Sequence, residues 1–274
     1  MSPKLFDAFS RFISNELGIK MPTGKRSMLQ SRLQKRLRFL KLDSFEDYYA
    51  YVFNSPSRDQ EIIHLLDVVT TNKTDFYREP RHYDVLVQTV IPDLLRRKGA
   101  GVRRPLKIWS AGCSTGAEPY TLTMVLSDLS ASIESFKFQI LATDICTRVL
   151  EIGRNAIYEE REAKTIPPAA LKKYMLRGKD RTRPRIRVVP EMRRLVEFRR
   201  LNLMDDDYGM PDSMDIVFCR NVIIYFDRPT QLAVLQRICR CLKSGGYLFM
   251  GHSETLNGMD LPLLQITANV YQIK

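Results

Sequence analysis

Short apolar runs alternate with helical patterns over the second half of the chain, and this alternation limits the possible folds more than any other feature. The first run, at residues 106–110, leads into a glycine-containing loop and a helix that reaches about residue 130. Further strands are predicted at residues 138–143, 195–200, 214–219, 247–251 and 270–273. Strands that alternate with helices build a mostly parallel sheet covered on both faces. The sequence therefore predicts an α/β fold.

Two other segments lack this alternation. Residues 1–100 show helical periodicity, with Ser2 and Gly18 as the ends of the first helix and Pro92 as a predicted kink. After Pro167 and Pro168 the chain is rich in arginine and predicts a short helix and a small hairpin. The expected parts are a helical N-terminal domain (1–75), a linker with connecting helices (76–105), a sheet domain (106–274) and an inserted β-subdomain (155–194).

The net charge of +12 and the spacing of the cysteines narrow the functional classes. A positive balance favours acidic partners such as nucleic acid, anionic membranes or acidic protein surfaces. No stretch reaches the roughly 18 apolar residues of a membrane span, and the N-terminus lacks the layout of a signal peptide. None of the five cysteines has CxxC spacing and there are only three histidines, so we expect buried reduced thiols and no metal site.

The loop that begins at Gly112 suits some nucleotide-like ligands and excludes others. A P-loop would need a lysine where Glu118 stands, and a carboxylate there repels phosphates. A dinucleotide loop would need its central glycine where Ser114 stands. S-adenosylmethionine (SAM) carries no phosphate and has two positively charged groups. It therefore suits a loop in which Gly112 and Gly116 let the backbone approach it.

Two carboxylates are placed to contact such a ligand. Glu118 would face the cationic part of SAM, and Asp144 would end the next strand, where an acidic residue binds ribose hydroxyls in related sheets. The alternative is that Glu118 only stabilises the start of a helix, where carboxylates are favoured by the helix dipole. Asp144 favours the ligand over this alternative.

A series of motifs follows in a fixed order. They are TTNKTDFYRE (70–79), WSAGCSTGAEPY (109–120), ILATDI (140–145), LNLMD (201–205), DIVFCRNVIIYFD (215–227) and GGYLFMGHSE (245–254). Together they resemble the CheR-type chemotaxis receptor glutamate methyltransferases over nearly the whole chain. The resemblance implies a Rossmann-like, SAM-dependent methyltransferase sheet with an all-α N-terminal domain and a small inserted β-subdomain.

The resemblance also implies roles for single residues. The expected cofactor-binding residues are Asn72, Thr74, Arg78, Gly112, Glu118, Asp144, Asn202, Leu203, Arg220 and Asn221, and the expected catalytic residues are Tyr225 and Arg78. In the family, the residues matching Asn202 and Leu203 flank the adenine, and Tyr225 matches a tyrosine near the transferred methyl group. Without the family, Asn72 and Thr74 would serve as loop caps, Arg78 as a surface charge and Tyr225 as a core residue.

The implied reaction is an SN2 transfer of a methyl group from the sulfonium of SAM to a glutamate oxygen. A carboxylate with a pKa of about 4.3 is already ionised at neutral pH, so no general base is required. Alignment of the reacting atoms can contribute up to roughly 7–11 kcal/mol, and a dry site favours a reaction in which two charges cancel. We expect Tyr225 and Arg78 to position the reactants without transferring protons.

The partners are expected to be the helical bundles of transmembrane chemoreceptors. Arg32, Lys35 and Arg36 lie on the basic side of the helix over residues 23–41, and we expect them to bind this substrate. The alternative is a solvated polar face. Loop 178–184 carries charges where family members that bind a receptor pentapeptide tend to have glycines, which favours an enzyme without that tether. We expect a cytoplasmic monomer recruited to receptor arrays.

Two rival functions remain for a basic SAM-binding chain. A nucleic-acid methyltransferase that modifies amines usually carries an Asn/Asp-Pro-Pro-aromatic motif after the fourth strand. This chain reads RNVIIYF at that point, and the next proline along the chain is Pro229. Aromatic signatures of RNA binding are also missing. A non-catalytic cofactor-binding module is the other rival, and the intact motif series argues against it. We therefore expect no nucleic-acid partner and no membrane insertion.

Overall fold

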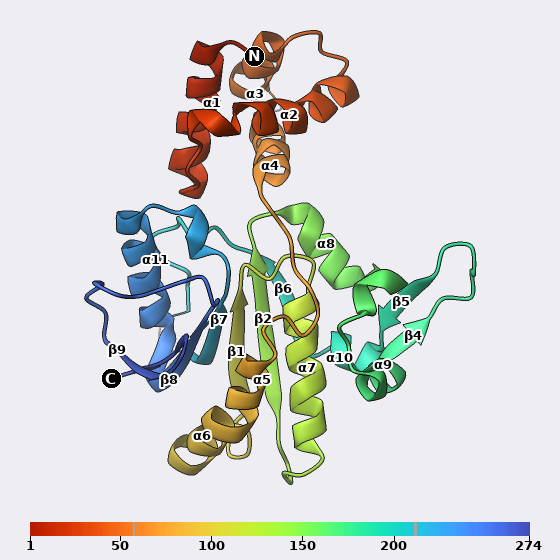
Figure 1. The fold of residues 1–274 in the computed structure, drawn as a ribbon, viewed down its shortest axis with the longest axis vertical. Helices are drawn as coiled ribbons and strands as arrows, with labels where there is room; N and C mark the ends of the chain where they lie inside the picture. Colours follow the sequence, from red (N-terminus) through yellow and green to blue (C-terminus); the bar gives the residue numbers. More distant parts are fainter. Residues whose placement is uncertain (57, 211–212) are drawn as a thin grey trace.

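The computed structural model describes residues 1–56, 58–210 and 213–274. Figure 1 shows a helical domain above a sheet domain, with a smaller part that projects from the side of the sheet domain. The helical domain consists of α1 (Pro3–Leu17), the 3₁₀ turn η1 (Thr23–Lys25), α2 (Arg26–Leu40), α3 (Phe45–Asn54) and α4 (Arg58–Val69). Its helices enclose a core of their own, in which Phe9, Leu33 and Tyr48 are fully buried.

The predicted helix ends form by local capping. The hydroxyl of Ser2 accepts a hydrogen bond from the N–H of Leu5, and Gly18 takes a left-handed conformation with φ of 67° after α1. Ser44 caps α3 through the N–H of Asp47. A side chain at Gly18 would collide with the sheet domain, since a Cβ there would lie 2.6 Å from the sulfur of Met204. The end of α1 therefore packs directly against the sheet domain.

A bent helical segment follows the extended linker and packs against the sheet domain (Figure 1). It comprises α5 (Arg81–Val85), the π-helical turn η2 (Leu86–Val90) and α6 (Ile91–Lys98). The interruption predicted at Pro92 takes the form of this π-helical turn. The turn ends immediately before α6, and Pro92 stands in the first turn of α6, where its lack of an N–H group costs no hydrogen bond. The domain boundaries at residues 75 and 105 stay predictions.

A seven-stranded sheet forms the centre of the larger domain. Its order is β6-β2-β1-β7-β8-β10-β9, and the pairs are parallel except for β8–β10 and β10–β9. The strands are β1 (Leu106–Ala111), β2 (Phe138–Asp144), β6 (Val196–Arg200), β7 (Met214–Cys219), β8 (Leu242–Met250), β9 (Leu263–Thr267) and β10 (Val270–Ile273). The intervening helices are α7 (Ala117–Ser130), α8 (Thr147–Asn155) and α11 (Arg228–Cys241). The mostly parallel sheet predicted from the alternation is confirmed.

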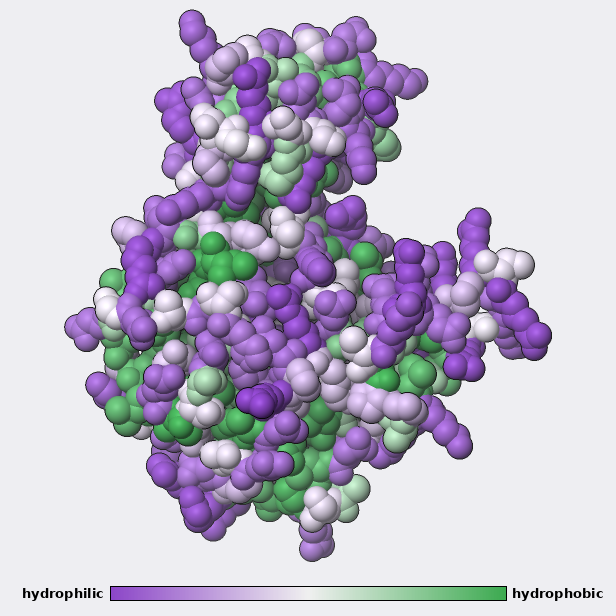
Figure 2. Space-filling view, in the orientation of Figure 1, coloured by the Kyte–Doolittle hydropathy of each residue, from purple (hydrophilic) through white to green (hydrophobic). Residues whose placement is uncertain are grey.

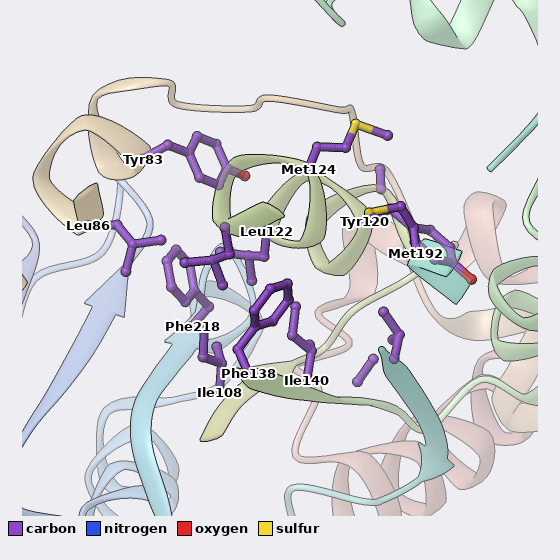
Figure 3. Close-up of a cluster of buried hydrophobic side chains, with 14 of the residues drawn as sticks. Tyr83, Leu86, Ile108, Tyr120, Leu122, Met124, Phe138, Ile140, Met192 and Phe218 are labelled. Carbon is purple, nitrogen blue, oxygen red and sulfur yellow. The ribbon is translucent and has the colours of Figure 1, made fainter. Parts of the chain in front are cut away.

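Both faces of this sheet are buried, because neighbouring residues of a strand point to opposite sides. Ile108 and Phe218 belong to the apolar cluster that includes side chains of α7, and Figure 3 shows this cluster in close-up. The residues next to them in the strands, Trp109 and Val217, belong to a second cluster that includes side chains of α11. The near-continuous apolar runs of β1 and β7 follow from this burial on both sides.

The inserted β-subdomain projects to the side of α7 and α8 (Figure 1). It has a three-stranded antiparallel sheet in the order β3-β5-β4. Its elements are β3 (Ile157–Glu159), the 3₁₀ turn η3 (Glu160–Ala163), α9 (Pro168–Tyr174), β4 (Met175–Arg177), β5 (Arg185–Val188) and α10 (Pro190–Arg193). The short helix and the hairpin predicted for this segment are both present.

The two domains are joined by hydrogen bonds as well as by the linker. Asp67, at the end of α4, is buried, and its carboxylate accepts from the N–H and the hydroxyl of Thr147 at 2.8 and 2.6 Å. It also accepts from the N–H of Arg148 at 3.2 Å and so caps α8 from the other domain. Asn202 donates to the carbonyl oxygen of Glu16 at 2.7 Å. The N-terminal domain is thereby fixed over the carboxyl ends of the parallel strands.

The burial of the cysteines and the character of the helices concern the chain as a whole. All five cysteines lie buried, as predicted, and burial raises the pKa of the Cys113 and Cys219 thiols well above the ordinary value. Among the described residues, none of the helices combines the length and the apolar character that crossing a bilayer requires.

Candidate functional site

A cavity of about 430 Å³ lies between the helical domain and the sheet domain. It is formed at the carboxyl ends of β1, β2 and β7, whose following loops supply Gly112, Ile145 and Asn221 to its wall. The neighbours β2 and β7 lie on opposite sides of β1, so the chain changes direction across the sheet at this point. In open α/β sheets, ligands bind at such a switch point.

The residues that the sequence predicts for cofactor binding or catalysis line this cavity, with the exception of Gly116. They are Asn72, Thr74, Arg78, Gly112, Glu118, Asp144, Asn202, Leu203, Arg220, Asn221 and Tyr225. The sequence analysis missed a second group on the side of the helical domain, which comprises Ile19, Met21, Lys25 and Met28. No motif marks these residues, because they reach the cavity only through the packing of the two domains.

The glycine loop folds back over the end of β2. Gly112 has a φ of 74°, and the N–H groups of Gly112 and Cys113 both donate to the carbonyl oxygen of Thr143, at 2.8 and 2.9 Å. A Cβ on Gly112 would lie 2.4 Å from a methyl group of Val222. Position 112 is therefore restricted to glycine by its conformation and by the close approach of the loop after β7.

Gly116 has a packing role that its spacing does not predict. A Cβ on Gly116 would lie 3.1 Å from Phe198, 3.1 Å from the hydroxyl of Tyr158 and 3.2 Å from the Cα of Gly153. Its missing side chain makes room for α8 and for the β-subdomain beside the start of α7. Gly116 is not among the residues that line the cavity, and its approach to the cofactor stays a prediction.

Asp144 connects the glycine loop to the start of α8. Its Oδ2 accepts from the N–H of Ser114 and its Oδ1 from the N–H of Cys146, both at 2.9 Å. The residue is only 8% exposed. Burial raises the pKa of the Asp144 carboxyl above its ordinary value, although the hydrogen bonds from these N–H groups oppose the rise. Asp144 also lines the cavity, and a carboxylate can accept hydrogen bonds from hydroxyl groups in addition to these two.

Arg220 bridges two carboxylates beside the cavity. Its Nη1 lies 3.0 Å from Oε2 of Glu118, and its Nη2 lies 2.9 Å from Oε2 of Glu79. Nη2 also donates to the carbonyl oxygen of Arg78 at 2.5 Å, and the guanidinium is 2% exposed. This contact ties the linker to α7 and to the end of β7. Glu79 has no assigned role in the sequence analysis, although it lies within the first quoted motif.

The two carboxylates respond differently to their surroundings. Burial raises the pKa of Glu118 above its ordinary value, even though Arg220 and the Ser110 hydroxyl at 2.8 Å oppose this. Burial also raises the pKa of Glu79, but Arg220 and His252 outweigh it, and that pKa ends below its ordinary value. When both carboxylates are ionised, Arg220 offsets one of their two negative charges, and of the two it is Glu118 that lines the cavity.

Potential metal ligands gather at Glu79, His82 and His252, whose ligating atoms lie within 4.8 Å of one another. Burial, followed by the charge of Arg220, lowers the pKa of His82 to about 4, so its imidazole is neutral at pH 7. The Glu79 oxygen nearest His82, however, is the oxygen that pairs with Arg220. A divalent cation would share that carboxylate with a buried guanidinium, so the charges here favour the ion pair over a metal.

The linker and the short helix after β7 close the cavity from two sides. Ser114 donates to the carbonyl oxygen of Asn72 at 2.8 Å, which fixes the linker against the glycine loop. Tyr225 ends the 3₁₀ helix η4 (Ile223–Tyr225), and its carbonyl oxygen accepts from the N–H of Lys20 at 3.1 Å. Arg78 is half-buried at the mouth, where its Nη1 lies 3.3 Å from the carbonyl oxygen of Lys73.

The predicted substrate-binding residues lie on α2, apart from the cavity wall. Arg36 forms a bidentate pair with the buried Glu61, at 2.8 and 2.6 Å. Arg32 donates to the carbonyl oxygens of Val69 and Thr70 and therefore supports the start of the linker. Lys35 is exposed. The side chains of Arg32 and Arg36 thus make contacts within the protein, which a helical-wheel argument cannot distinguish from exposure to a partner.

Solved structures that resemble this chain include methyltransferases of low sequence identity. The citrinin polyketide synthase CMeT domain and the DszA carbon methyltransferase are each matched at 17% identity and a TM-score of 0.39. The matches cover 74% and 81% of this chain, which spans 41% and 46% of those chains. Similarity at this level carries no argument about function.

The sequence comparisons are specific. The description "CheR methyltransferase, all-alpha domain" matches residues 4–70, and "CheR methyltransferase, SAM binding domain" matches residues 72–271. Chemotaxis protein methyltransferase 2 of Pseudomonas aeruginosa is 40% identical over 237 residues, which cover 86% of this chain and 81% of that protein. The chemotaxis protein methyltransferase of Escherichia coli is 36% identical over 260 residues, which cover 95% and 87%. Since both domains match over nearly their whole length, the chain belongs to the CheR methyltransferase family.

Proposed function

We propose that the protein transfers the methyl group of SAM to glutamate side chains of chemoreceptors, giving glutamate methyl esters. The observation that carries this proposal is a cavity between the two domains, which is lined by all of the expected cofactor-binding and catalytic residues apart from Gly116. One side of it belongs to the domain that matches the SAM binding domain of the family, and the other to the all-alpha domain. A protein segment that docks on the helical domain would therefore reach a cofactor held by the sheet domain.

The residues of the cavity fit SAM by their charge. SAM has a positive sulfonium and a positive ammonium group and no phosphate, and Glu118 and Asp144 are anionic groups in the cavity wall. We assign Asp144 to the ribose hydroxyls, Glu118 to the cationic part, and Asn202 and Leu203 to the two sides of the adenine. Gly112, Asn72, Thr74 and Asn221 complete the wall. When bound, SAM supplies a methyl group on positively charged sulfur, which an ionised carboxylate can attack.

The contribution of the protein is alignment and exclusion of water. Tyr225 and Arg78 lie at the cavity on the side of η4 and the linker, where they can orient an incoming glutamate. Apolar side chains of the helical domain, including Ile19, Met21 and Met28, exclude water from the same space. No group in this assignment accepts or donates a proton, because the glutamate is ionised before it binds.

The docking surface is proposed to lie on α2. Lys35 and Arg38 are exposed there and flank a groove along the helix that Ser27, Gln30 and Gln34 also line. A positively charged groove suits the acidic, helical bundles of chemoreceptors. Since Arg32 and Arg36 bind groups within the protein, the charge that a receptor meets is assigned to Lys35 and Arg38.

The β-subdomain has a tightly turned hairpin loop. The N–H of Gly178 donates to the carbonyl oxygen of Arg185 at 2.8 Å, and Asp180 accepts from the N–H and the hydroxyl of Thr182. Loop 178–184 carries charged residues at positions where the family members with a pentapeptide tether tend to have glycines. We propose that the protein acts without this tether, as a monomer in the cytoplasm that is recruited to receptor arrays.

An assay with methyl-labelled SAM tests the proposed function. We expect base-labile label on chemoreceptor-rich membranes and none on bulk RNA, because methyl esters of glutamate hydrolyse in base. Charge reversal of Lys35 and Arg38 to glutamate should lower labelling of receptors and leave the affinity for S-adenosylhomocysteine (SAH) unchanged. Base-stable label on RNA would contradict the proposal and favour the nucleic-acid rival. Unchanged receptor labelling by the charge-reversal variant would show that α2 is not the docking surface, whereas loss of SAH affinity would indicate a folding defect.

Replacing Tyr225 with phenylalanine tests the positioning role of its hydroxyl. We expect kcat at saturating SAM and receptor to fall about tenfold or more, since a hydrogen bond to a charged group is worth about 1.5–3 kcal/mol. The Kd for SAM should stay near the wild-type value, because the change removes one oxygen and leaves the ring. Tyr271→Phe is the matched control, since that tyrosine lies on β10 outside the cavity wall. Full turnover by the Tyr225→Phe protein would refute the role of the hydroxyl.

A further inference from the structure

Glu254 is a buried carboxylate that has no role in cofactor binding or in positioning the substrate as proposed so far. It lies in the loop after β8 and is 4% exposed. Its Oε1 accepts from the N–H groups of Val222 and Ile223, at 2.9 and 3.0 Å. Its Oε2 accepts from the N–H groups of Asn221 and Gly251, at 2.9 and 2.7 Å. These donors are all backbone groups, so the carboxylate acts on the shape of the chain and not on a neighbouring side chain.

The loop that receives these hydrogen bonds has a conformation that needs support. Asn221 has a φ of 58°, in the left-handed region that residues other than glycine rarely occupy. Three consecutive N–H groups then point to one side, which makes a concave site for an anion. Gly251 completes the contact, because a Cβ there would lie 2.5 Å from the side-chain nitrogen of Asn221. The loop after β7 and the loop after β8 are therefore shaped together.

The same loop carries a large part of the proposed reaction site. Arg220, Asn221 and Val222 line the cavity, and η4, which begins at Ile223, ends at Tyr225. Val222 also packs against Gly112, so the loop after β7 sets the width of the cavity beside the glycine loop. The residues that Glu254 contacts thus lie between Arg220 and Tyr225, while its own side chain is not part of the cavity wall.

We infer that Glu254 is a positioning residue for methyl transfer, whose carboxylate holds residues 221–223 in the one shape that directs Asn221 to the cofactor and Tyr225 to the transferred methyl group. This inference rests on the proposed function. An anion is needed, because a neutral carboxyl or amide group would present a hydrogen atom to one of four N–H donors. Burial raises the pKa of Glu254, and its hydrogen bonds from the backbone oppose that rise.

Glu254→Gln is the most informative variant, since it preserves size and removes only the charge and one acceptor. We expect the Kd for SAH to rise about 10- to 100-fold, because a buried N–H group loses its partner and faces the amide NH₂ instead. We also expect kcat at saturating SAM to fall, because Tyr225 follows the same loop. A residue that only stabilised the fold would lower the melting temperature without changing either quantity per folded molecule.

Asp215→Asn is the matched control. Asp215 is also buried and also accepts a backbone hydrogen bond, from the N–H of Lys107 at 2.9 Å, in addition to its pairing with Arg104. It lies at the opposite end of β7, away from the cavity. We expect this variant to lose stability and to keep the wild-type Kd for SAH. If it lost SAH affinity by the same factor as Glu254→Gln, the effect would be general destabilisation and the inference would be wrong.

A second variant covers the case in which Glu254→Gln does not fold. Glu254→Asp keeps the negative charge but is shorter by one methylene group, so it cannot reach both pairs of donors. We expect it to fold and to bind SAH with an affinity between those of the wild type and the glutamine variant. Wild-type SAH affinity and kcat in either folded variant would overturn the inference. Failure of the wild-type protein itself to bind SAH would instead overturn the proposed function.

Discussion

Replacement of Arg220 with methionine is expected to destabilise the protein by about 3–5 kcal/mol, because it leaves buried carboxylates without a counter-charge. Glu79 and Glu118 both pair with this guanidinium, and Arg220 also donates to the carbonyl oxygen of Arg78. For a chain of this size, such a loss corresponds to a fall in Tm of about 6–20 °C. SAH affinity should fall at least about tenfold as well, because hydrogen bonds to a charged group at the cavity wall are lost.

The pH dependence of this variant follows from the ionic state of the two carboxylates. Arg220 and His252 outweigh burial and depress the pKa of Glu79, so the wild-type ion pair contributes stability at neutral pH that is lost as the pH falls through that depressed pKa. In the variant, the two buried carboxylates lose the guanidinium that balances their charge, and acid relieves them by protonation. The difference in Tm between wild type and variant should therefore shrink from mildly alkaline to mildly acidic pH.

Thermal unfolding over this pH range and titration with SAH measure both effects. Arg104→Met is the control, because Arg104 pairs with the buried Asp215 at the far end of β7. It should lower Tm and leave SAH affinity intact. If Arg220→Met lost no more stability than a surface substitution, the bridge between the linker and α7 would be of no consequence for the fold.

Replacement of Asp144 with asparagine is expected to raise the Kd for SAM about 10- to 100-fold, since hydrogen bonds to a charged group contribute about 1.5–3 kcal/mol. Its carboxylate also accepts from the N–H groups of Ser114 and Cys146, and an amide NH₂ would face one of these donors. SAM and SAH share the ribose, so both affinities should fall by the same factor. Asp128→Asn, on the side of α7 that meets Tyr174, is the control.

Acidity should affect the wild-type protein and this variant differently. Burial raises the pKa of Asp144, and burial also raises that of Glu118, so these carboxylates are protonated at a higher pH than free ones. A cationic ligand binds the ionised form, and wild-type SAM affinity should therefore decline as the pH falls through these raised values. The variant should show a smaller decline, because only Glu118 remains to titrate. Equal SAM affinity in the two proteins would exclude Asp144 from the binding site.

The regular parts of the fold were predictable because their signals are local. The predicted strands at residues 214–219 and 270–273 coincide with β7 and β10, since a buried strand appears as a short apolar run between loops. β9 was missed, because it lies at the edge of the sheet and its residues are half-buried or exposed. At Pro92 the sequence predicts an interruption, but the π-helical turn that accommodates it depends on the packing of η2 under the sheet.

The candidate site was predictable only where motifs mark it. Asp144 and Glu118 stand at the ends of elements that the periodicity locates, and the order of the motifs gave Asn72, Asn202 and Tyr225. The basic residues of α2 show where this reasoning ends. Arg36 and Arg32 lie on the polar side of the helix, yet their partners come from α4 and the linker, far away in the sequence. Periodicity identifies a polar face but does not identify what covers it.

By itself, the sequence determined the α/β class, the helical N-terminal segment and the inserted hairpin, because hydrophobic periodicity, capping residues and loop glycines act within a few residues of one another. Most of the candidate site residues came instead from the resemblance to the CheR family. Only the tertiary structure brings Glu79 to Arg220, Glu254 to the backbone of residues 221–223, and Lys25 to the wall of the cavity. These contacts join elements that meet only after the chain has packed, so no local pattern marks them.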